Sequence, residues 1–552
     1  MDGGQRRGVR KITAQTLRSW RMRPDLVVAL TGTTLIVLLH VCFSPGVGGL
    51  WRDEVNTLNL ATLPTWGSLW KFHNQDSFPL LFAALVRSWS GIFGGTDDSL
   101  RFLGLLIGLG VVAALWINAR LLGLAFPFWS LALVGANPLI IRYGDSVRAY
   151  GLGLMLLLLM FGLLWKLTQS LRSQWFVVAT ITSVLAVHAL YYNAVLLFAI
   201  CTGGCAVAWR QKRWRTAIAV LGVGLIAALS LLPYLPTFLH ANDWNFLVQY
   251  PFTLTWMWSR LKGVIGSPHW IGTFAWLALV LAALVVGGFT IFRRRADAET
   301  SRERQYLVTF CVVALVVGVV AYAGFLKLLS YYTQAWYYVA LLTFAAVCID
   351  PILSPAKGRV HRITRAAAVA LFLALTAVPS SRIISLRHTN IDFVANALHV
   401  MATPDDFILV TRWECGVTMN RYYKGPAAWA TIPPLIDFRF QAYQPVMEHM
   451  KAADPLRLIM ERAEQTLRSG HKVWLVGEAP VPPPGEEAPM LPRVVDLSSK
   501  WRGSALFYRV WVMQMTGFLT SHMVHATKLS RASIGPVSDF ENLPVQVIEG
   551  WK

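Results

Sequence analysis

The chain has 552 residues, of which 55% are hydrophobic and only 14% are charged. Soluble domains usually carry about 25% charged residues, so this composition excludes an ordinary soluble enzyme and a disordered protein, and it indicates a polytopic membrane protein. Lys and Arg number 50 against 29 Asp and Glu, which gives a net charge of +21. No nucleic-acid-binding motif accompanies this charge, so we expect membrane topology or anionic lipid, and no nucleic acid, to account for it.

The first 25 residues form a basic tail, which we expect to remain in the cytoplasm ahead of a first span. Crossing a bilayer takes about 17–25 mostly apolar residues. The sequence contains about eleven such runs when one short run and one divided run are counted. The predicted spans lie near residues 26–46, 100–119, 124–141, 149–167, 175–209 (two spans), 216–236, 270–292, 305–327, 335–353 and 364–380.

The linkers between the predicted spans differ in charge. Those at 209–215, 292–295 and 357–362 are basic, and the positive-inside rule places them in the cytoplasm. The segment 47–99 then faces outward, as expected for a multi-pass protein of the cytoplasmic (inner) membrane with a cytoplasmic N-terminus. The apolar stretch 79–94 would reverse this parity if it crossed, so we expect it to lie on the outer membrane surface as an amphipathic helix.

Ionisable residues gather at the outward ends of the spans, where burial is costly and their presence indicates function. Arg52, Asp53 and Glu54 follow the first span directly. Two adjacent carboxylates beside an arginine suit general-base catalysis, because the arginine can orient one carboxylate and set its pKa. Alternatively, Asp53 serves as the N-cap of a helix at 54–63. The sequence leaves both interpretations open.

A second outward segment, residues 72–80, carries His73 and Asp76. His73 either orients a substrate or binds a metal, or it is a solvated loop histidine. It has no metal-ligating partner at a diagnostic spacing. We therefore expect no metal site and no cofactor, and we keep both residues as candidates for substrate binding.

The segment 141–150 places Arg142, Asp145 and Arg148 at the start of an apolar helix. The forked guanidinium of arginine matches the oxygens of a phosphate, so both arginines are candidates for a lipid phosphate. The alternative is that they extend toward lipid headgroups without a specific ligand.

Two aromatic segments complete the set. His188, Tyr191 and Tyr192 lie at a break between two short spans, and Lys327 is followed closely by Tyr331. Tyr and Trp at a membrane interface commonly form an aromatic belt. They also suit sugar recognition, through apolar ring faces and hydroxyl groups.

After residue 381 charges return and no further run of 18 apolar residues occurs. Residues 381–552 therefore predict a globular α/β domain, which lies outside the cytoplasm if the parity holds. Its expected elements are helices at 390–401 and 455–468 and strands at 407–411, 472–476 and 505–515.

The motifs follow one another in a defined order: Arg52-Asp53-Glu54, His73 with Phe78-Pro79-Leu80, Asp98-Ser-Leu-Arg101, Asn118-Ala-Arg-Leu-Leu-Gly123, Arg142, Arg148-Ala-Tyr150 and the His188 break. As a set they resemble the GT-C class of membrane glycosyltransferases, in particular aminoarabinose transferase, protein O-mannosyltransferases and the galacturonosyltransferases of lipopolysaccharide core. The resemblance covers residues 26–350. The chain departs from many relatives where Phe78-Pro79-Leu80 lacks a double proline and Arg148-Ala-Tyr150 lacks an Asp.

The resemblance implies an all-α GT-C-like domain over residues 26–380 and a small extracytoplasmic α/β domain over 381–552. It implies transfer of a sugar from a polyprenyl-phosphate-linked donor to a cell-envelope acceptor (a lipid, polysaccharide or protein), with inversion at the anomeric carbon. Asp53 would be catalytic, with Glu54 beside it. The implied donor-phosphate residues are Arg52, Arg142, Arg148 and Lys327, and the remaining substrate-binding candidates are His73, Asp76, Asp145, His188, Tyr191, Tyr192 and Tyr331.

Two functions of other classes stay open on the sequence. A transporter or flippase of lipid-linked glycans predicts charged or broken helices at mid-membrane together with inverted repeats, whereas the ionisable residues here gather at one face. A non-catalytic membrane scaffold predicts that Asp53 is dispensable.

Overall fold

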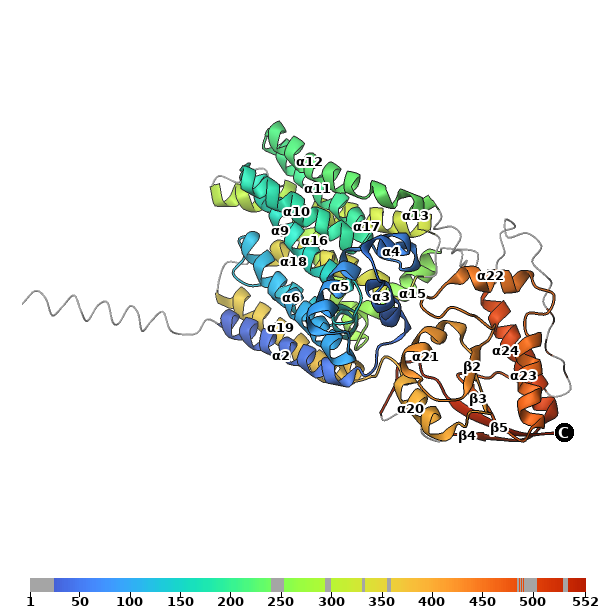
Figure 1. Ribbon diagram of the computed structural model, residues 1–552. Coiled ribbons are helices and arrows are strands. Elements are labelled where there is room, and N and C mark those ends of the chain that lie inside the picture. Colours follow the sequence, from blue (N-terminus) through green and yellow to red (C-terminus); the bar gives the residue numbers. More distant parts are fainter. Residues whose placement is uncertain are drawn as a thin grey trace, which may run out of the picture.

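The computed structural model describes residues 24–239, 253–292, 299–329, 333–354, 359–483, 504–529 and 535–552, together with single positions between 486 and 490. A bundle of long helices forms one domain, and a smaller α/β domain adjoins one end of it (Figure 1). The short helices α3 and α15 lie at that end, between the bundle and the α/β domain.

Nine helices within the described residues are long and apolar enough to cross a membrane, in agreement with nine of the predicted spans. The chain is therefore a multi-pass membrane protein. Seven of them are α2 (Pro24–Gly46), α6 (Asp97–Leu121), α9 (Tyr150–Gln169), α11 (Tyr192–Arg210), α16 (Ile271–Phe292), α17 (Glu299–Leu329) and α19 (Arg359–Ile384). The other two reach this length together with an adjoining turn: α12 (Trp214–Ser230) continues to Thr237, and α18 (Val339–Leu353) is preceded by a 3₁₀ turn from Ala335.

The two other predicted spans form helices of 17 residues or fewer. The divided run separates after α10 (Ser173–Ala189), which has 17 residues and precedes α11. The short run forms α7 (Phe128–Ser130), a π-helical turn over Leu131–Gly135 and α8 (Pro138–Gly144). Asn137 caps α8, because its side chain accepts hydrogen bonds from the next turn. The total of eleven spans stays a prediction.

Two glycines of α6 determine where the turn after α8 can pack. A Cβ atom at Gly104 would lie 2.0 Å from the carbonyl oxygen of Asp145, and one at Gly108 would lie 1.9 Å from Asp145 Oδ1. The absence of side chains at these positions lets the turn pack directly against α6. This contact fixes the position of Arg148, three residues farther along the chain.

The first loop, residues 47–96, folds into α3 (Arg52–Ala61), α4 (Trp66–Lys71), a 3₁₀ turn (His73–Gln75) and α5 (Leu81–Phe93). With 13 residues, α5 is shorter than a span requires. It is amphipathic: Phe82 and Val86 are buried, whereas Ser88 is exposed. Arg87 donates to the carbonyl of Ala61 at 3.0 Å. The predicted amphipathic helix at 79–94 is thus present.

Short elements also lie between α12 and α16, directly before α18, and after the first strand of the C-terminal domain. They are a 3₁₀ turn over Leu232–Tyr234, α13 (Leu235–Leu239), α15 (Leu254–Ile265), a 3₁₀ turn over Ala335–Tyr338 and another over Trp413–Cys415.

The C-terminal domain is built on one five-stranded sheet in the order β2-β1-β3-β5-β4. Strands β2, β1 and β3 are parallel, and β5 and β4 are antiparallel to their neighbours. The strands are β1 (Phe407–Val410), β2 (Ala428–Thr431), β3 (Val473–Val476), β4 (Met523–Lys528) and β5 (Val545–Trp551). The helices are α20 (Ile391–Met401), α21 (Gly416–Tyr422), α22 (Tyr443–Lys451), α23 (Arg457–Arg468) and α24 (Ser504–His522).

Helices cover both faces of this sheet (Figure 1). Phe407 and Leu409 pack against α22, α23 and α24, whereas Ile408 and Val410 pack against α20 and α21. All four residues of β1 are buried, as expected for a parallel strand with helices on both sides. The predicted strands at 407–411 and 472–476 and the predicted helices at 390–401 and 455–468 are confirmed.

The prediction of a strand at 505–515 is wrong, because helix α24 covers this stretch. Phe507, Trp511 and Met515 recur every four residues and are buried against the sheet. That spacing places them on one helical face. The aromatic and β-branched residues of the segment favour a strand only when this period is overlooked.

Candidate functional site

The first turn of α3 separates the two candidate carboxylates. The helix begins at Arg52 with Trp51 as its N-cap, so Asp53 is the second helical residue and not the cap. The capping contact belongs to Glu54, whose Oε2 accepts a hydrogen bond from the Trp51 backbone N–H at 3.1 Å. Asp53 is therefore free of the structural role that the sequence allowed for it.

Glu54 is completely buried and lies against Arg101 of α6. The guanidinium donates to both carboxylate oxygens, with Nη2 2.8 Å from Oε2, and the Val147 N–H donates to Oε1 at 2.9 Å. Burial acts to raise the pKa of Glu54, but the charges and hydrogen bonds of Arg101 and His388 together outweigh it and hold the pKa well below its usual range. Glu54 thus anchors α3 to α6 and to the turn before α9.

Arg148 joins α3 to the segment 72–80. Its Nη1 donates to the Asp53 carbonyl at 2.9 Å and to Thr57 Oγ1 at 2.6 Å, and it lies 3.0 Å from Asp76 Oδ1. The guanidinium carbon lies 4.5 Å from the centre of the Phe78 ring, within the range of a cation–π contact. Three segments that the sequence singled out separately therefore meet at this arginine.

Asp76 is buried in the same group. Its Oδ2 accepts from Thr57 Oγ1 at 2.7 Å, and its Oδ1 accepts from the Ser77 backbone N–H at 2.7 Å. Burial raises the pKa of Asp76, and the charge of Arg148 opposes that shift. Both oxygens of Asp76 are occupied by protein donors, so this residue supports Arg148.

Asp53 keeps the most accessible carboxylate of the four that the sequence proposed. Its side chain is 23% exposed, against 0% for Glu54, 5% for Asp76 and 1% for Asp145. Its Oδ1 accepts a hydrogen bond from Gln441 Nε2 at 3.0 Å. Asp53 is thus the predicted acid that a substrate can reach most easily.

Arg52 lies beside this carboxylate, with its Nε 3.6 Å from Asp53 Oδ1. Its Nη1 lies 3.5 Å from Glu414 Oε1 of the C-terminal domain. Burial acts to lower the pKa of Arg52, but the charges of Glu414 and Asp53 raise it overall. The guanidinium therefore stays cationic next to Asp53.

Arg142 and Asp145 have separate partners. Arg142 Nη1 donates to the carbonyls of Ile383 and Leu386 at 3.0 and 2.7 Å, at the C-terminal end of α19. Asp145 contacts His40 Nδ1 at 2.8 Å inside the bundle. His40 is not among the residues predicted from the sequence, although a histidine within an apolar span is a recognisable signal.

Tyr234 contacts three candidate residues that lie in separate segments of the sequence. Its ring centre lies 5.5 Å from that of His73, 5.5 Å from that of His188 and 6.0 Å from that of Tyr191. The Tyr234 hydroxyl accepts from the Leu80 N–H at 3.2 Å. The His73 ring is also hydrogen-bonded, with its Nε2 2.7 Å from Thr237 Oγ1.

The remaining candidates lie near α17. Tyr192 is buried and packs against Tyr322 and Tyr337. Lys327 is exposed in the last turn of α17. Tyr331 lies outside the described residues. Among the residues that the structure describes, no group of three or more His, Cys, Asp or Glu is placed to hold a metal ion.

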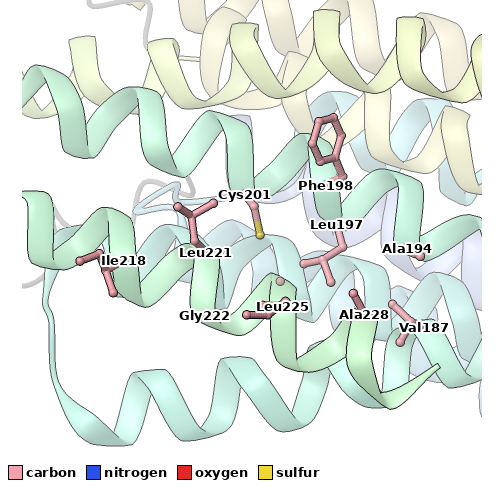
Figure 2. A pocket seen from close by; sticks show the side chains of 11 residues that line it. Val187, Ala194, Leu197, Phe198, Cys201, Ile218, Leu221, Gly222, Leu225 and Ala228 are labelled. Atoms are coloured by element: carbon pink, nitrogen blue, oxygen red, sulfur yellow. The ribbon is translucent and has the colours of Figure 1, made fainter. Parts of the chain in front are cut away.

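A cavity of about 630 Å³ lies elsewhere in the bundle, between α10, α11 and α12. Figure 2 shows its lining, which consists of apolar side chains with the sulfur of Cys201 among them. A wall of this composition offers no charge or strong hydrogen-bond donor to a sugar or a phosphate. The polar cluster around Asp53, and not this cavity, is the candidate active site.

No family model matches the sequence, and no curated protein matches it. The structure is similar to the crystal structure of the Archaeoglobus fulgidus oligosaccharyltransferase tethered with an acceptor peptide, at a TM-score of 0.49 and 12% identity, over 95% of this chain and 75% of that chain. It is also similar to ArnT from Cupriavidus metallidurans bound to undecaprenyl phosphate, at a TM-score of 0.44 and 12% identity, over 80% of this chain and 92% of that chain. ArnT in the apo state gives a TM-score of 0.46 with the same identity and coverage.

Proposed function

We propose that this protein is a membrane glycosyltransferase, which moves a sugar from a polyprenyl-phosphate-linked donor to a cell-envelope acceptor at the outer face of the cytoplasmic membrane. The observation that carries the proposal is the accessible carboxylate of Asp53 at the end of a membrane bundle, with Arg52 beside it and Arg148 bound to the Asp53 backbone carbonyl. The motif set that resembles GT-C glycosyltransferases includes these same residues. The proposal places the N-terminus in the cytoplasm and the C-terminal domain outside it.

Asp53 is the proposed general base. Its carboxylate takes the proton of an acceptor hydroxyl while that oxygen attacks the anomeric carbon of the donor sugar. The bond from the anomeric carbon to the phosphate oxygen breaks, and polyprenyl phosphate leaves with the bonding electrons. A single displacement of this kind inverts the anomeric configuration. Glu54 is proposed to hold α3 in place, because its carboxylate is buried and bound to Arg101.

The leaving phosphate needs positive charge close to the reacting carbon. Arg148 is the first proposed source, since its buried Nε has no hydrogen-bond acceptor among the described residues and its guanidinium is within hydrogen-bond distance of the Asp53 backbone. Arg52 is the second, because it lies beside the Asp53 carboxylate. Lys327 is proposed to reach the phosphate from α17. Arg142 is proposed to act by holding the end of α19.

A lipid-linked donor follows from the proposed location. Nucleotide sugars are cytoplasmic, so a transferase that works outside needs a sugar already carried across on a lipid. The aromatic cluster of His73, His188, Tyr191 and Tyr234 is proposed to contact the sugar or the acceptor, because ring faces and hydroxyl groups together bind carbohydrate.

The proposal is tested with the purified protein in lipid nanodiscs. A panel of undecaprenyl-phosphate-linked pentoses, hexoses and uronic acids serves as donor, membrane extracts supply acceptors, and the readout is release of undecaprenyl phosphate. We expect turnover with at least one donor, and we expect Asp53→Asn to lower it by about 10²–10⁴-fold, the usual effect of losing a general base. Asp405→Asn, which removes a carboxylate 71% exposed on the C-terminal domain, is the matched control and keeps full turnover.

Two results would contradict the proposal. Equal turnover by Asp53→Asn and the parent protein excludes Asp53 as the base. Movement of the intact lipid-linked sugar between leaflets of sealed proteoliposomes, with no cleavage from any donor, assigns the protein to the transporters instead.

A further inference from the structure

One loop of the C-terminal domain, residues 439–441, contacts α3. Asn59 Nδ2 donates to the Arg439 carbonyl at 2.8 Å, and Asn56 Oδ1 accepts from the Gln441 backbone N–H at 2.9 Å. Between these two bonds the Phe440 ring is buried, and its centre lies 5.7 Å from that of Phe72. The backbone of residues 439–441 is therefore fixed to the first loop on both sides of Phe440.

This anchored loop places one side chain on the proposed base. Gln441 Nε2 donates to Asp53 Oδ1 at 3.0 Å. A carboxylate only accepts hydrogen bonds, so the amide nitrogen, and not the amide oxygen, must face Asp53. The bond restricts the rotation of the carboxylate and points its other oxygen away from Gln441.

A neutral donor suits this position. Arg101 binds both oxygens of Glu54 and leaves that carboxylate no free oxygen for a substrate. Gln441 contacts one oxygen of Asp53 and adds no charge, so the second oxygen can still accept a proton. Orientation of the base without occupation of both oxygens is what a general base requires.

The same turn of α3 is held by a second residue of the C-terminal domain. Glu541 Oε2 accepts from the Arg52 backbone N–H at 2.9 Å, and its Oε1 accepts from Thr418 Oγ1 at 2.7 Å. Since Arg52 precedes Asp53 directly, the backbone of the base is fixed from the C-terminal domain as well as its side chain.

We infer that Gln441 is a positioning residue for sugar transfer, which completes the site from the C-terminal domain by orienting the Asp53 carboxylate. The inference rests on the proposed function, in which Asp53 is the base. It assigns the C-terminal domain a part in the reaction in addition to any contact with an acceptor.

The test compares three variants of the full-length protein in nanodiscs, with the undecaprenyl-phosphate-linked sugar that gives the highest turnover as the probe. Gln441→Leu and Gln441→Met keep the size of the side chain and remove the donor. Asn59→Ala removes the neighbouring bond to the Arg439 carbonyl without touching Asp53, and it controls for loosening of the interface. Thermal unfolding midpoints establish that each variant is folded.

We expect kcat to fall about tenfold in both Gln441 variants, with KM for the donor changed less than twofold, because orientation of the base affects the chemical step and not binding. Asn59→Ala keeps the parent kcat. Adding Gln441→Leu to Asp53→Asn produces no further loss, since the side chain acts only through Asp53.

The outcomes separate the inference from the function on which it rests. If Asp53→Asn abolishes turnover but kcat is unchanged in both Gln441 variants, the inference is overturned and the proposed function stands. An equal loss of kcat in Asn59→Ala also overturns the inference, because the loop would then act only by holding the two domains together. Full turnover by Asp53→Asn overturns the proposed function itself.

Discussion

Arg101 binds both carboxylate oxygens of Glu54, with Nη2 2.8 Å from Oε2, where neither side chain is more than 5% exposed. The pair joins the first turn of α3 to the first membrane helix after it. A buried ion pair of this kind is costly to break, because the partner left behind carries an uncompensated charge.

We therefore expect Arg101→Met to lower the apparent free energy of unfolding by about 3–5 kcal/mol. The measurement is denaturant-induced unfolding of the purified protein in detergent. The double variant Arg101→Met with Glu54→Leu removes both charges and should be more stable than Arg101→Met alone. A double variant that is less stable than both single variants would contradict this account of the pair.

Glu541 predicts a dependence of stability on pH. Burial raises the pKa of Glu541 from its ordinary 4.5 to about 7, against the opposing charges of Arg52 and Arg412. The folded state therefore holds this proton more tightly than the unfolded state. The resulting stability is fully present below the unfolded pKa and is lost as the pH rises through 7.

The expected loss between pH 4.5 and 7 is about 3 kcal/mol, from about 1.36 kcal/mol per pKa unit. Glu541→Gln imitates the protonated side chain, so its unfolding midpoint should decline less over this interval than that of the parent protein. Parallel declines of the two proteins would show that Glu541 does not titrate in this range.

Gly108 predicts a steric effect. A Cβ atom there would lie 1.9 Å from Asp145 Oδ1 and 2.7 Å from His40 Nδ1, so Gly108→Ala must displace the buried pair that these residues form. We expect destabilisation of about 1–3 kcal/mol or more, measured as a lower unfolding midpoint. Gly91→Ala in α5 is the control: its Cβ would meet nothing within 4 Å, and alanine favours the helix.

The sequence was sufficient for features that depend on local pattern. Apolar runs located nine of the spans, and the unbroken run of apolar residues in β1 fits a strand buried on both faces. The error at 505–515 has a local cause too, since Phe507, Trp511 and Met515 follow a helical period that the aromatic content obscured.

Contacts between distant segments could not be predicted in this way. Gln441 lies more than 380 residues from Asp53 in the sequence, and Tyr234 contacts His73 from the end of another helix. No local pattern indicates such pairs. The sequence also could not show that Glu54 is buried and Asp53 accessible, because neighbouring residues of a helix point in different directions and only the packing decides which one is buried.

The hydrogen bonds from the C-terminal domain to α3 can form only in a certain order during biosynthesis. The first loop is made before the residues that fix it, since Gln441 and Glu541 follow α19 in the chain. Asp53 consequently stays unaligned while the bundle is inserted. Its alignment is completed only after the C-terminal domain has been made and has folded, so the proposed base is positioned later than the loop that carries it.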